Sequence, residues 1–246
     1  MDLRRKQFTA RVWSKLVLWD KAEGLLKKGD RILAAVSGGP DSVCLAHFLA
    51  VLSRRKKLSV SLLHVHHGLR GKSADRDAAF VQRLGNDLGL PVRVVQVKVT
   101  ALAQAQKRSL EDAARRLRYQ ALIKEARRLR CNKVATGHHL DDQAETVLLH
   151  LLRSSRLGAL GAMAPKRRLA KGVALIRPLL PLRRTEVLAY LKIHGLKYRL
   201  DHTNQDDRFT RNWIRLKVLP LLESHNPKIR ERLASFAAQV RRQKID

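Results

Sequence analysis

The sequence has few cysteines, few aromatic residues and no long apolar run. Its 246 residues include two cysteines, and aromatic side chains make up 4%. Two thiols, Cys44 and Cys131, are too few for a disulfide framework and favour buried free cysteines in a reducing cytosol. No stretch is apolar enough to span a bilayer, and residues 1–15 lack the apolar core of a signal peptide. We therefore expect a cytoplasmic protein with no membrane partner.

Acidic residues are also scarce relative to basic ones. The chain has 51 Lys and Arg against 21 Asp and Glu, a formal net charge of +30. This excess favours polyanions such as nucleic acids as partners. The excess is denser in residues 153–246, where we expect most of a nucleic-acid contact. A generally basic protein without such a partner is the alternative.

Apolar residues, by contrast, make up 45% of the chain, enough for one sizeable core. Up to about residue 152, strand-like runs alternate with helix-like stretches. Strands are predicted at 31–36, 60–65, 92–97 and 133–136, and helices at 42–54, 73–88, 109–128 and 140–152. This alternation predicts an α/β fold, a doubly wound parallel sheet with helices on both faces. A ligand is then expected beyond the carboxyl ends of the strands.

After residue 152 the pattern changes to a helical C-terminal extension. A glycine-bearing loop at 154–163 is followed by the basic run Lys166–Arg168, which we expect to be a mobile loop. Helices are predicted at 185–194, 211–222 and 227–244, and an amphipathic N-terminal helix around residues 12–18.

The run S-G-G-P-D-S, residues Ser37–Ser42, lies between the first predicted strand and the helix that follows it. A strand, a glycine turn and a helix N-terminus form an anion site, because unpaired backbone N–H groups and the helix dipole converge there. Asp41 is placed to hold Mg²⁺ beside a bound phosphate. The run lacks the G-K-[ST] ending of a Walker A loop. A helix merely capped by Ser37 or Asp41 is the simpler alternative.

Three histidines follow the second predicted strand: His64, His66 and His67, in the run H-V-H-H-G-L-R. No further residues have zinc-ligand spacing, so we favour the lining of a nucleotide pocket over a zinc site. Arg70, which ends the run, is a candidate to contact a phosphate or an RNA backbone.

Two arginines, Arg115 and Arg118, lie three residues apart near the start of the helix predicted at 109–128. They share a helix face, and two guanidinium groups at the sheet edge can clamp phosphates. For Arg115, an ion pair with Glu111 four residues earlier is an equal alternative.

The run G-H-H-L-D-D-Q-A-E-T, residues 137–146, follows the fourth predicted strand. With helical spacing, His138, Asp142 and Glu145 point the same way. Beside a phosphate loop such carboxylates can hold Mg²⁺ or receive an amine, although acids at a helix start can also act as simple caps.

Two further arginines, Arg211 and Arg215, stand one helical turn apart in the basic C-terminal part. They make a plausible nucleic-acid surface, and an interdomain helix cap is an equal alternative.

Together these motifs resemble those of the tRNA(Ile)-lysidine synthetase family within the PP-loop ATP-pyrophosphatase superfamily. The matching runs are S-G-G-P-D-S, H-V-H-H-G-L-R-G-x-S, S-L-E-D-A-A-R-R-L-R-Y, G-H-H-L-D-D-Q-A-E-T, L-G-A-M, D-x-T-N and R-N-W-I-R, in family order from about residue 31 to 220. Two positions depart from the family: His66 stands where Asn is usual, and Ser154–Arg156 replaces a glycine-richer loop.

The resemblance implies an adenine nucleotide alpha hydrolase-like fold. It places a PP-loop ATP-pyrophosphatase catalytic domain at residues 1–217, including the N-terminal helix, and a linker helix at 218–246. Many members carry further C-terminal tRNA-binding domains, which we expect to be absent here. The resemblance also suggests a homodimer.

The activity that the resemblance implies is a two-step ligation. Cytidine O2 at the first anticodon position of a tRNA(Ile) with a CAU anticodon attacks the α-phosphate of ATP, and pyrophosphate leaves. The ε-amine of free L-lysine then attacks C2 of that base, and AMP leaves, which forms lysidine.

The resemblance also implies a role for each candidate residue. The pyrophosphate cradle would comprise Ser37, Gly38, Gly39, Pro40, Asp41 and Ser42. Asp41 and Asp142 would hold Mg²⁺, while Arg118 and His138 match positions at the reacting phosphate and nucleotide. The lysine ammonium would be received by Asp142 and Glu145. The tRNA would be contacted by Arg70, Arg211 and Arg215.

Three alternative functions are compatible with the same fold. A PP-loop tRNA thiolation enzyme also adenylates a base, but most such enzymes use paired cysteines or an iron–sulfur cluster, and the two cysteines here are poorly spaced for either. A non-catalytic basic RNA-binding protein would neither bind nor hydrolyse ATP. A glutamine-dependent amidotransferase half lacks an ammonia-supplying partner domain and fits poorly with a charge of +30.

Overall fold

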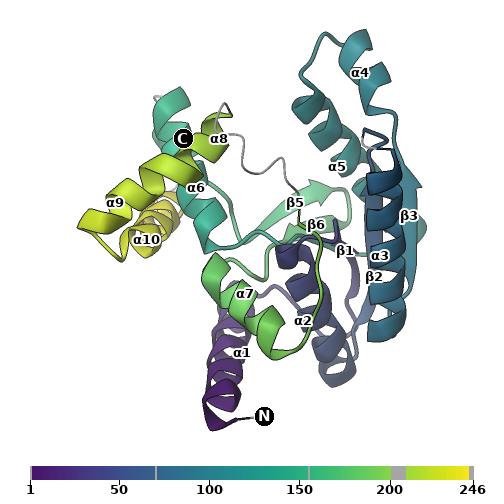
Figure 1. The fold of residues 1–246 in the computed structure, drawn as a ribbon, viewed down its shortest axis with the longest axis horizontal. Helices are drawn as coiled ribbons and strands as arrows, with labels where there is room; N and C mark the ends of the chain where they lie inside the picture. The colour runs from purple at the N-terminus through teal and green to yellow at the C-terminus, as the bar shows by residue number, and fades with distance from the viewer. Residues whose placement is uncertain (1, 70, 155, 201–208, 244–246) are drawn as a thin grey trace.

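The alternating pattern of the first 152 residues folds into strands separated by helices (Figure 1). The structure, a computed structural model, describes residues 2–69, 71–154, 156–200 and 209–243. Its strands are β1 (Arg31–Ala35), β2 (Ser59–His66), β3 (Val92–Gln96), β4 (Lys133–Ala135), β5 (Lys166–Ala170) and β6 (Val173–Ile176). Its helices are α1 (Leu3–Glu23), α2 (Pro40–Lys56), α3 (Lys72–Leu88), α4 (Val99–Ala105), α5 (Leu110–Arg128), α6 (Leu140–Arg153), α7 (Arg184–Ile193), α8 (Thr210–Trp213), α9 (Leu219–His225) and α10 (Ile229–Arg242).

The six strands form one sheet in the order β3-β2-β1-β4-β6-β5. All neighbouring strands run parallel except β5, which pairs antiparallel with β6. The predicted doubly wound α/β fold is thus confirmed. The chain winds outward from β1 to β3, then returns to place β4 on the other side of β1. The crevice between the ends of β1 and β4 is therefore the switch point where such sheets bind ligands.

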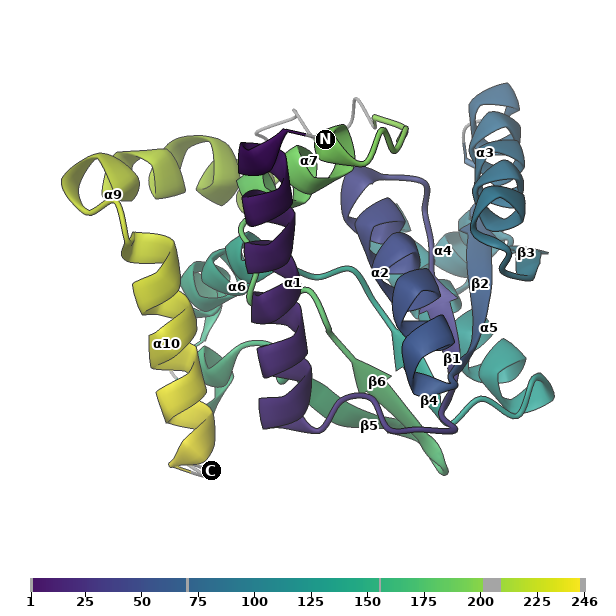
Figure 2. The same cartoon turned by 90° about the horizontal axis from the view of Figure 1, so that it is seen from below.

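The two faces of the sheet are covered by different helices. Ile32 and Ala34 of β1 pack into an apolar cluster with α1, α2, α3 and α7, whereas Leu33 packs with α5 on the opposite face. Figure 1 shows α2 and α7 on one side of the sheet and α4 and α5 on the other, and Figure 2 shows α1 beside α2. Because β1 is buried on both faces, its carboxyl end is held rigidly by the core.

The sequence prediction was wrong at the basic run Lys166–Arg168, which is a strand and not a mobile loop. β5 is an edge strand, where basic side chains on the exposed positions are tolerated and oppose edge-to-edge association. Its apolar residues Leu169 and Ala170 pack against the cluster that contains Leu175 of β6. β6 and the short helix α4 were not predicted, because each is short and has no clear periodicity of its own.

The last helices pack against α6 rather than extending away from the sheet. A π-helical segment, Ile214–Val218, joins α8 to α9. Ile214 and Leu219 are fully buried against Ala144 of α6, and Leu233 of α10 packs beside them. The division of the chain at residue 217 stays a prediction.

Both cysteines are free and buried, as predicted. Among the described residues, no helix is both long and apolar enough to cross a bilayer.

Candidate active site

The Ser37–Ser42 loop is folded around the side chain of Ser42. The Ser42 hydroxyl accepts hydrogen bonds from the backbone N–H of Ser37 at 3.2 Å and of Gly38 at 3.1 Å, and donates to the carbonyl of Gly39 at 2.8 Å. Gly38 has a φ of +93°, a conformation that favours glycine. Pro40 is the first residue of α2, a position where proline is favoured because the N–H that it lacks would have no intrahelical partner. The loop therefore brings backbone N–H groups together at the start of α2, where a bound phosphate can accept hydrogen bonds from them.

A second loop, from the end of β4 to α6, lies directly on the first. A Cβ atom on Gly137 would come within 2.8 Å of the carbonyl oxygen of Asp41 and 3.2 Å of the backbone nitrogen of Ser42. Real Cβ atoms do not approach backbone this closely, so only glycine permits the contact. This contact brings the predicted G-H-H-L-D-D run to the N-terminus of α2.

A buried histidine, His139, stands among three carboxylates at this junction. Its Nε2 lies 3.5 Å from Oδ1 of Asp41 and 3.5 Å from Oδ2 of Asp142. Its Nδ1 lies 3.5 Å from Oδ2 of Asp141, and its backbone N–H donates to Asp142 at 3.0 Å. The imidazole is 1% exposed, so these charges are poorly screened. Asp41 and Asp142, which come from different loops, therefore both lie next to the imidazole of His139.

The charge of His139 follows from this setting. Burial opposes protonation, but Asp142, Asp141 and Asp41 together raise the pKa of His139 to about 9. Burial also raises the pKa of Asp41, although His139 and Arg184 lower it in part. His139 and Arg211 outweigh burial at Asp142 and hold the pKa of that carboxyl well below its usual range.

The raised pKa predicts a pH dependence of stability. Because the folded-state pKa exceeds the ordinary value of 6.5, the stabilisation from His139 is fully present below pH 6.5 and is lost as the pH rises through about 9. We expect the free energy of unfolding of the wild type to fall by about 3 kcal/mol over this window, relative to His139→Asn. Urea unfolding of both proteins without divalent cations measures this difference, and parallel pH profiles would contradict it.

The neighbouring histidine, His138, is in the opposite state. Burial lowers its pKa to about 4. The charge of Asp142 raises the pKa, whereas the charges of Arg177, Arg211 and Arg115 also lower it. Its Nδ1 is 2.9 Å from the hydroxyl of Thr136. The site therefore contains a neutral imidazole, His138, next to a protonated one, His139.

The predicted lysine-binding acids are paired with the predicted tRNA-binding arginines. Arg211 donates to Glu145 at 2.9 Å and to Asp142 at 3.2 Å, and Arg215 donates to both oxygens of Glu145 at 2.6 and 3.0 Å. Glu145 is 1% exposed. The C-terminal helices thus contribute to the site itself, which sequence spacing did not indicate.

Sequence reasoning also missed the residues that orient Asp141. This carboxylate accepts from the backbone N–H of Arg184 at 2.8 Å and from the guanidinium of Arg230 at 2.9 Å, while the Arg184 side chain pairs with Asp41 at 3.3 Å. Since Arg230 is on α10, this chain of contacts links the last helix to His139. The only signal in the sequence was the doubled H-H and D-D within one motif.

The remaining candidates form no hydrogen bond or ion pair with His139 or its acids among the described residues. Arg118 is exposed on α5 and makes no ion pair with any described residue. Arg115 stacks on Tyr119 rather than pairing with Glu111. His64 contacts the Val36 carbonyl at 2.9 Å, and His66 contacts Asp75 at 3.1 Å. Arg70, the D-x-T-N motif at 201–204 and residue 155 lie outside the described residues.

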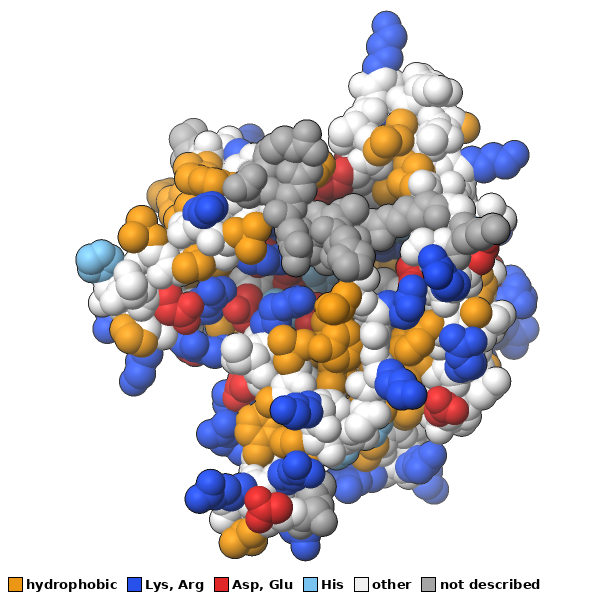
Figure 3. Space-filling view, viewed as in Figure 1, with side chains coloured by type: hydrophobic (Ala, Val, Ile, Leu, Met, Phe, Trp, Pro, Cys, Tyr) orange, Lys and Arg blue, Asp and Glu red, His pale blue; other side chains and the backbone are white. Residues whose placement is uncertain are grey.

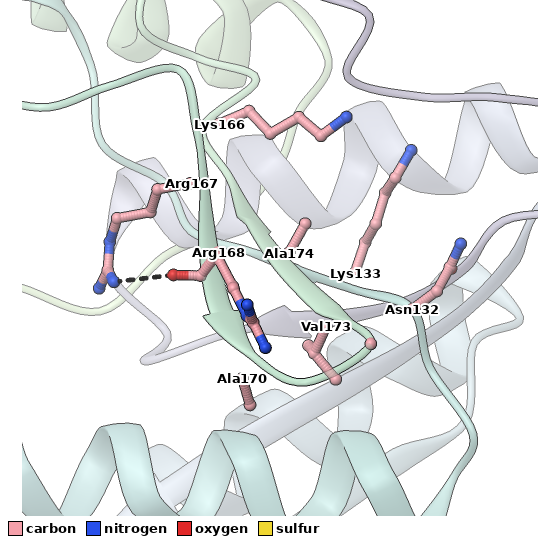
Figure 4. A pocket seen from close by; sticks show the side chains of 9 residues that line it. Asn132, Lys133, Lys166, Arg167, Arg168, Ala170, Val173 and Ala174 are labelled. Carbon is pink, nitrogen blue, oxygen red and sulfur yellow. Dashed lines mark hydrogen bonds between the residues drawn. The ribbon is translucent and has the colours of Figure 1, made fainter.

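A shallow hollow of about 610 Å³ lies elsewhere, near the amino ends of β4 and β6 (Figure 4). Its lining includes Lys133, Lys166 and Arg168. The switch point is at the opposite ends of these strands, so we assign the chemistry to the junction around His139 and not to this hollow.

Comparison with known families agrees with this geometry. The model of the PP-loop domain family matches residues 10–222. The chain belongs to the PP-loop family. Membership implies ATP as the nucleotide, and the backbone donors gathered in the Ser37–Ser42 loop fit its phosphates.

Curated relatives share close sequence similarity with most of this chain. The tRNA(Ile)-lysidine synthase of Symbiobacterium thermophilum is 45% identical over 219 residues, which cover 89% of this chain and 45% of that protein. That of Dehalococcoides mccartyi is 46% identical over 221 residues, covering 88% and 47%, and that of Geobacter sulfurreducens 40% identical over 226 residues, covering 92% and 47%. The chain thus spans about half the length of these relatives.

Solved structures of lower sequence identity share the fold. The U34-tRNA thiolase NcsA from Methanococcus maripaludis superposes with a TM-score of 0.75 at 18% identity, covering 98% of this chain and 81% of that one. The NH3-dependent NAD synthetase from Campylobacter jejuni gives a TM-score of 0.51 at 18% identity, covering 98% and 95%.

Proposed function

We propose that this chain catalyses the ATP-dependent ligation of free lysine onto C2 of the first-anticodon cytidine of tRNA(Ile) with a CAU anticodon, forming lysidine. The observation that carries the proposal is the 40–46% identity to the three curated lysidine synthases described above, over almost nine-tenths of this chain. The site supports it, because a phosphate loop and a group of buried acids meet at one junction.

In the first step, the Ser37–Ser42 loop binds the β- and γ-phosphates through its backbone N–H groups. Asp41 fits a metal ion, because its Oδ1 is buried and accepts no hydrogen bond from the described residues. Asp41 Oδ1 and Asp142 Oδ2 each lie 3.5 Å from Nε2 of His139, so both carboxylates face one point, and they are proposed to hold the metal ion together. Mg²⁺, when bound, neutralises charge on the phosphates. Arg118 is proposed to approach the reacting phosphate from α5.

In the second step, the acids of α6 receive the lysine ammonium. Glu145 and Asp142 are anionic acceptors, and Arg211 and Arg215 occupy them in this structure. The arginines orient the acids until the substrate amine competes for them. His138 is neutral at pH 7, so it adds no positive charge that would repel the ammonium.

Mass spectrometry of nucleosides tests the proposal directly. After incubation of unmodified tRNA(Ile) with ATP, Mg²⁺ and lysine, we expect a cytidine whose mass has increased by lysine minus water. Omission of lysine should stop the reaction at an adenylated tRNA. An unchanged cytidine under conditions in which the protein binds both ATP and tRNA would refute the proposal.

Glu145→Gln is expected to separate the two steps. The amide keeps the shape of the side chain but removes the charge that attracts the ammonium, so the KM for lysine should rise about tenfold or more. Adenylation should fall much less, and adenylated tRNA should accumulate in assays with labelled ATP. Glu111→Gln, an exposed acid on α5, is the matched control. An equal loss in both steps would contradict a role in lysine binding.

Thiolation is not favoured as an alternative. Cys44 and Cys131 lie on opposite faces of the sheet, and burial raises the pKa of both thiols. A thiolate nucleophile or cluster ligand needs the opposite setting.

A further inference from the structure

A cluster of arginines surrounds Tyr119 on the α5 side of the sheet. The guanidinium carbon of Arg115 lies 5.3 Å from the centre of the Tyr119 ring, and that of Arg167 lies 5.6 Å from it. Arg177, at the end of β6, is the third cation, and its charge acts together with those of Arg115 and Arg167. We call these four residues, from α5, β5 and β6, the Tyr119 cluster.

The arginines of this cluster are unlike most of those in the active site. Arg184, Arg211, Arg215 and Arg230 each pair with a carboxylate. Among the described residues, none of the three cluster arginines forms an ion pair with an acid. Three guanidinium groups without a paired acid, two of them against the Tyr119 ring, repel one another, so the cluster favours an anion.

Arg177 gives the cluster a buried anchor. Its side chain is 4% exposed, and its Nε is buried without a hydrogen-bond partner among the described residues. Burial, with the charges of Arg167 and Arg115, lowers the pKa of Arg177 to about 10. An unsatisfied buried donor is unfavourable, and a bound anion that accepts its hydrogen bond would relieve this cost.

The cluster adjoins the active site. Arg177 directly follows β6, whose carbonyl at Ile176 accepts from the backbone N–H of Thr136, two residues before His138. The charges of Arg177 and Arg115 also act on His138. Arg115 and Arg167 are exposed whereas Arg177 is buried, so an anion can reach the cluster from solvent through the two exposed arginines.

We propose that the Tyr119 cluster binds a backbone phosphate of the RNA strand that carries the target base. The inference rests on the proposed function. A guanidinium group can donate two hydrogen bonds to the oxygens of one phosphate, and an aromatic ring between two guanidinium groups fixes the orientation of both. An RNA phosphate fits better than a phosphate of ATP, because the Ser37–Ser42 loop already supplies donors for the nucleotide. Phosphate contacts of this kind set the register of the strand.

The overall charge of the protein does not show where the RNA strand binds. Figure 3 shows Lys and Arg side chains spread over most of the visible face, with few acidic ones between them. The test must therefore separate the cluster from the general positive charge.

The sequence provides matched controls at the next residue in each case. Arg116 follows Arg115 on α5 and donates to Gln106 at 3.1 Å. Arg168 follows Arg167 on β5, and Figure 4 shows Arg167 on the opposite side of the strand from Lys166 and Lys133. The double variants Arg115→Gln/Arg167→Gln and Arg116→Gln/Arg168→Gln remove the same charge from the same two elements, at exposed positions that should not alter folding.

The experiment measures the Kd of the full chain for an anticodon stem-loop RNA with a CAU anticodon, by fluorescence anisotropy over a series of salt concentrations, together with the KM for ATP. We expect Arg115→Gln/Arg167→Gln to weaken RNA binding about tenfold near physiological salt and to reduce the salt slope by about one. The control pair should change Kd by less than about threefold, and the KM for ATP should stay unchanged.

The first three of the following outcomes would overturn the inference. Equal losses in the two double variants would mean that only general charge matters. A raised KM for ATP with unchanged RNA binding would assign the cluster to the nucleotide. Lysidine formation with no difference between the variants would refute the cluster but not the proposed function. A difference in RNA binding without any lysidine formation would support the cluster and refute the proposed function.

Discussion

Asp41→Asn is expected to reduce tRNA-dependent release of pyrophosphate from ATP by about 100-fold or more. Asparagine matches the shape of aspartate but cannot neutralise a metal ion. Asp41 Oδ1 is buried and has no hydrogen-bond partner within the part of the chain that the structure describes, and Oδ2 accepts from Arg184 at 3.3 Å. The substitution therefore removes one charge at the point where the phosphate loop meets the acids of α6, and leaves His139 and Arg184 with fewer anionic partners.

The measurement is pyrophosphate release with and without tRNA, at increasing Mg²⁺. If Asp41 holds the metal, the Mg²⁺ concentration for half-maximal activity should rise in the variant, while the Kd for tRNA should change by less than about twofold. Asp142→Asn is expected to behave in the same way. Asp112→Asn, an exposed acid on α5 paired with Arg108, controls for the loss of one negative charge. Activity within about threefold of the wild type in Asp41→Asn would remove the proposed metal role.

The sequence was sufficient to predict the parts of this site that lie within single motifs. The Ser37–Ser42 loop and the acids of α6 each follow a buried strand, and parallel strands bring such loops to one edge. The α/β class followed from the same alternation. These features depend on local spacing, which a single sequence contains.

Contacts between distant segments were not predictable in the same way. The pairing of Arg211 and Arg215 with Glu145 joins residues about 70 positions apart, and nothing in their spacing distinguishes a buried pair from a surface patch. Edge strand β5 was misread as a loop, because its exposed arginines hide the strand pattern. The position of Arg177 beside Arg115 and Arg167 likewise depends on β5 and β6 lying next to β4.

The role of His139 is an example of a feature that sequence spacing could not predict. Sequence reasoning selected His138 for its spacing from Asp142, although its neighbour makes the central contacts. The two residues have the same side chain and lie in the same motif, but one is protonated among three acids and the other is kept neutral by burial. That difference is set mainly by Asp142 and Asp141 of the same motif, and Asp41, which approaches from another loop across Gly137, adds to it.

Gly137→Ala is expected to abolish most of the activity although it adds only one methyl group. The added methyl group would lie 2.8 Å from the carbonyl oxygen of Asp41, and this neighbour is backbone that cannot rotate away. The two loops must therefore separate. Overpacking of this kind costs about 1–3 kcal/mol of stability. A displacement of the order of 1 Å between Asp41 and the acids of α6 is expected to reduce the rate of adenylation by about 100-fold.

Gly172→Ala separates this effect from general destabilisation. Gly172 is in the turn between β5 and β6, with a φ of +75° and no atom within 4 Å of the added methyl group, so alanine there costs about 1–2 kcal/mol of backbone strain alone. We expect both variants to lower the Tm by similar amounts, while only Gly137→Ala loses adenylation activity in assays well below the Tm. Equal activities at matched folded fractions would mean that the contact between the loops is structural. A selective loss would mean that the distance between the two loops, which a side chain at residue 137 would increase, limits transfer to the α-phosphate.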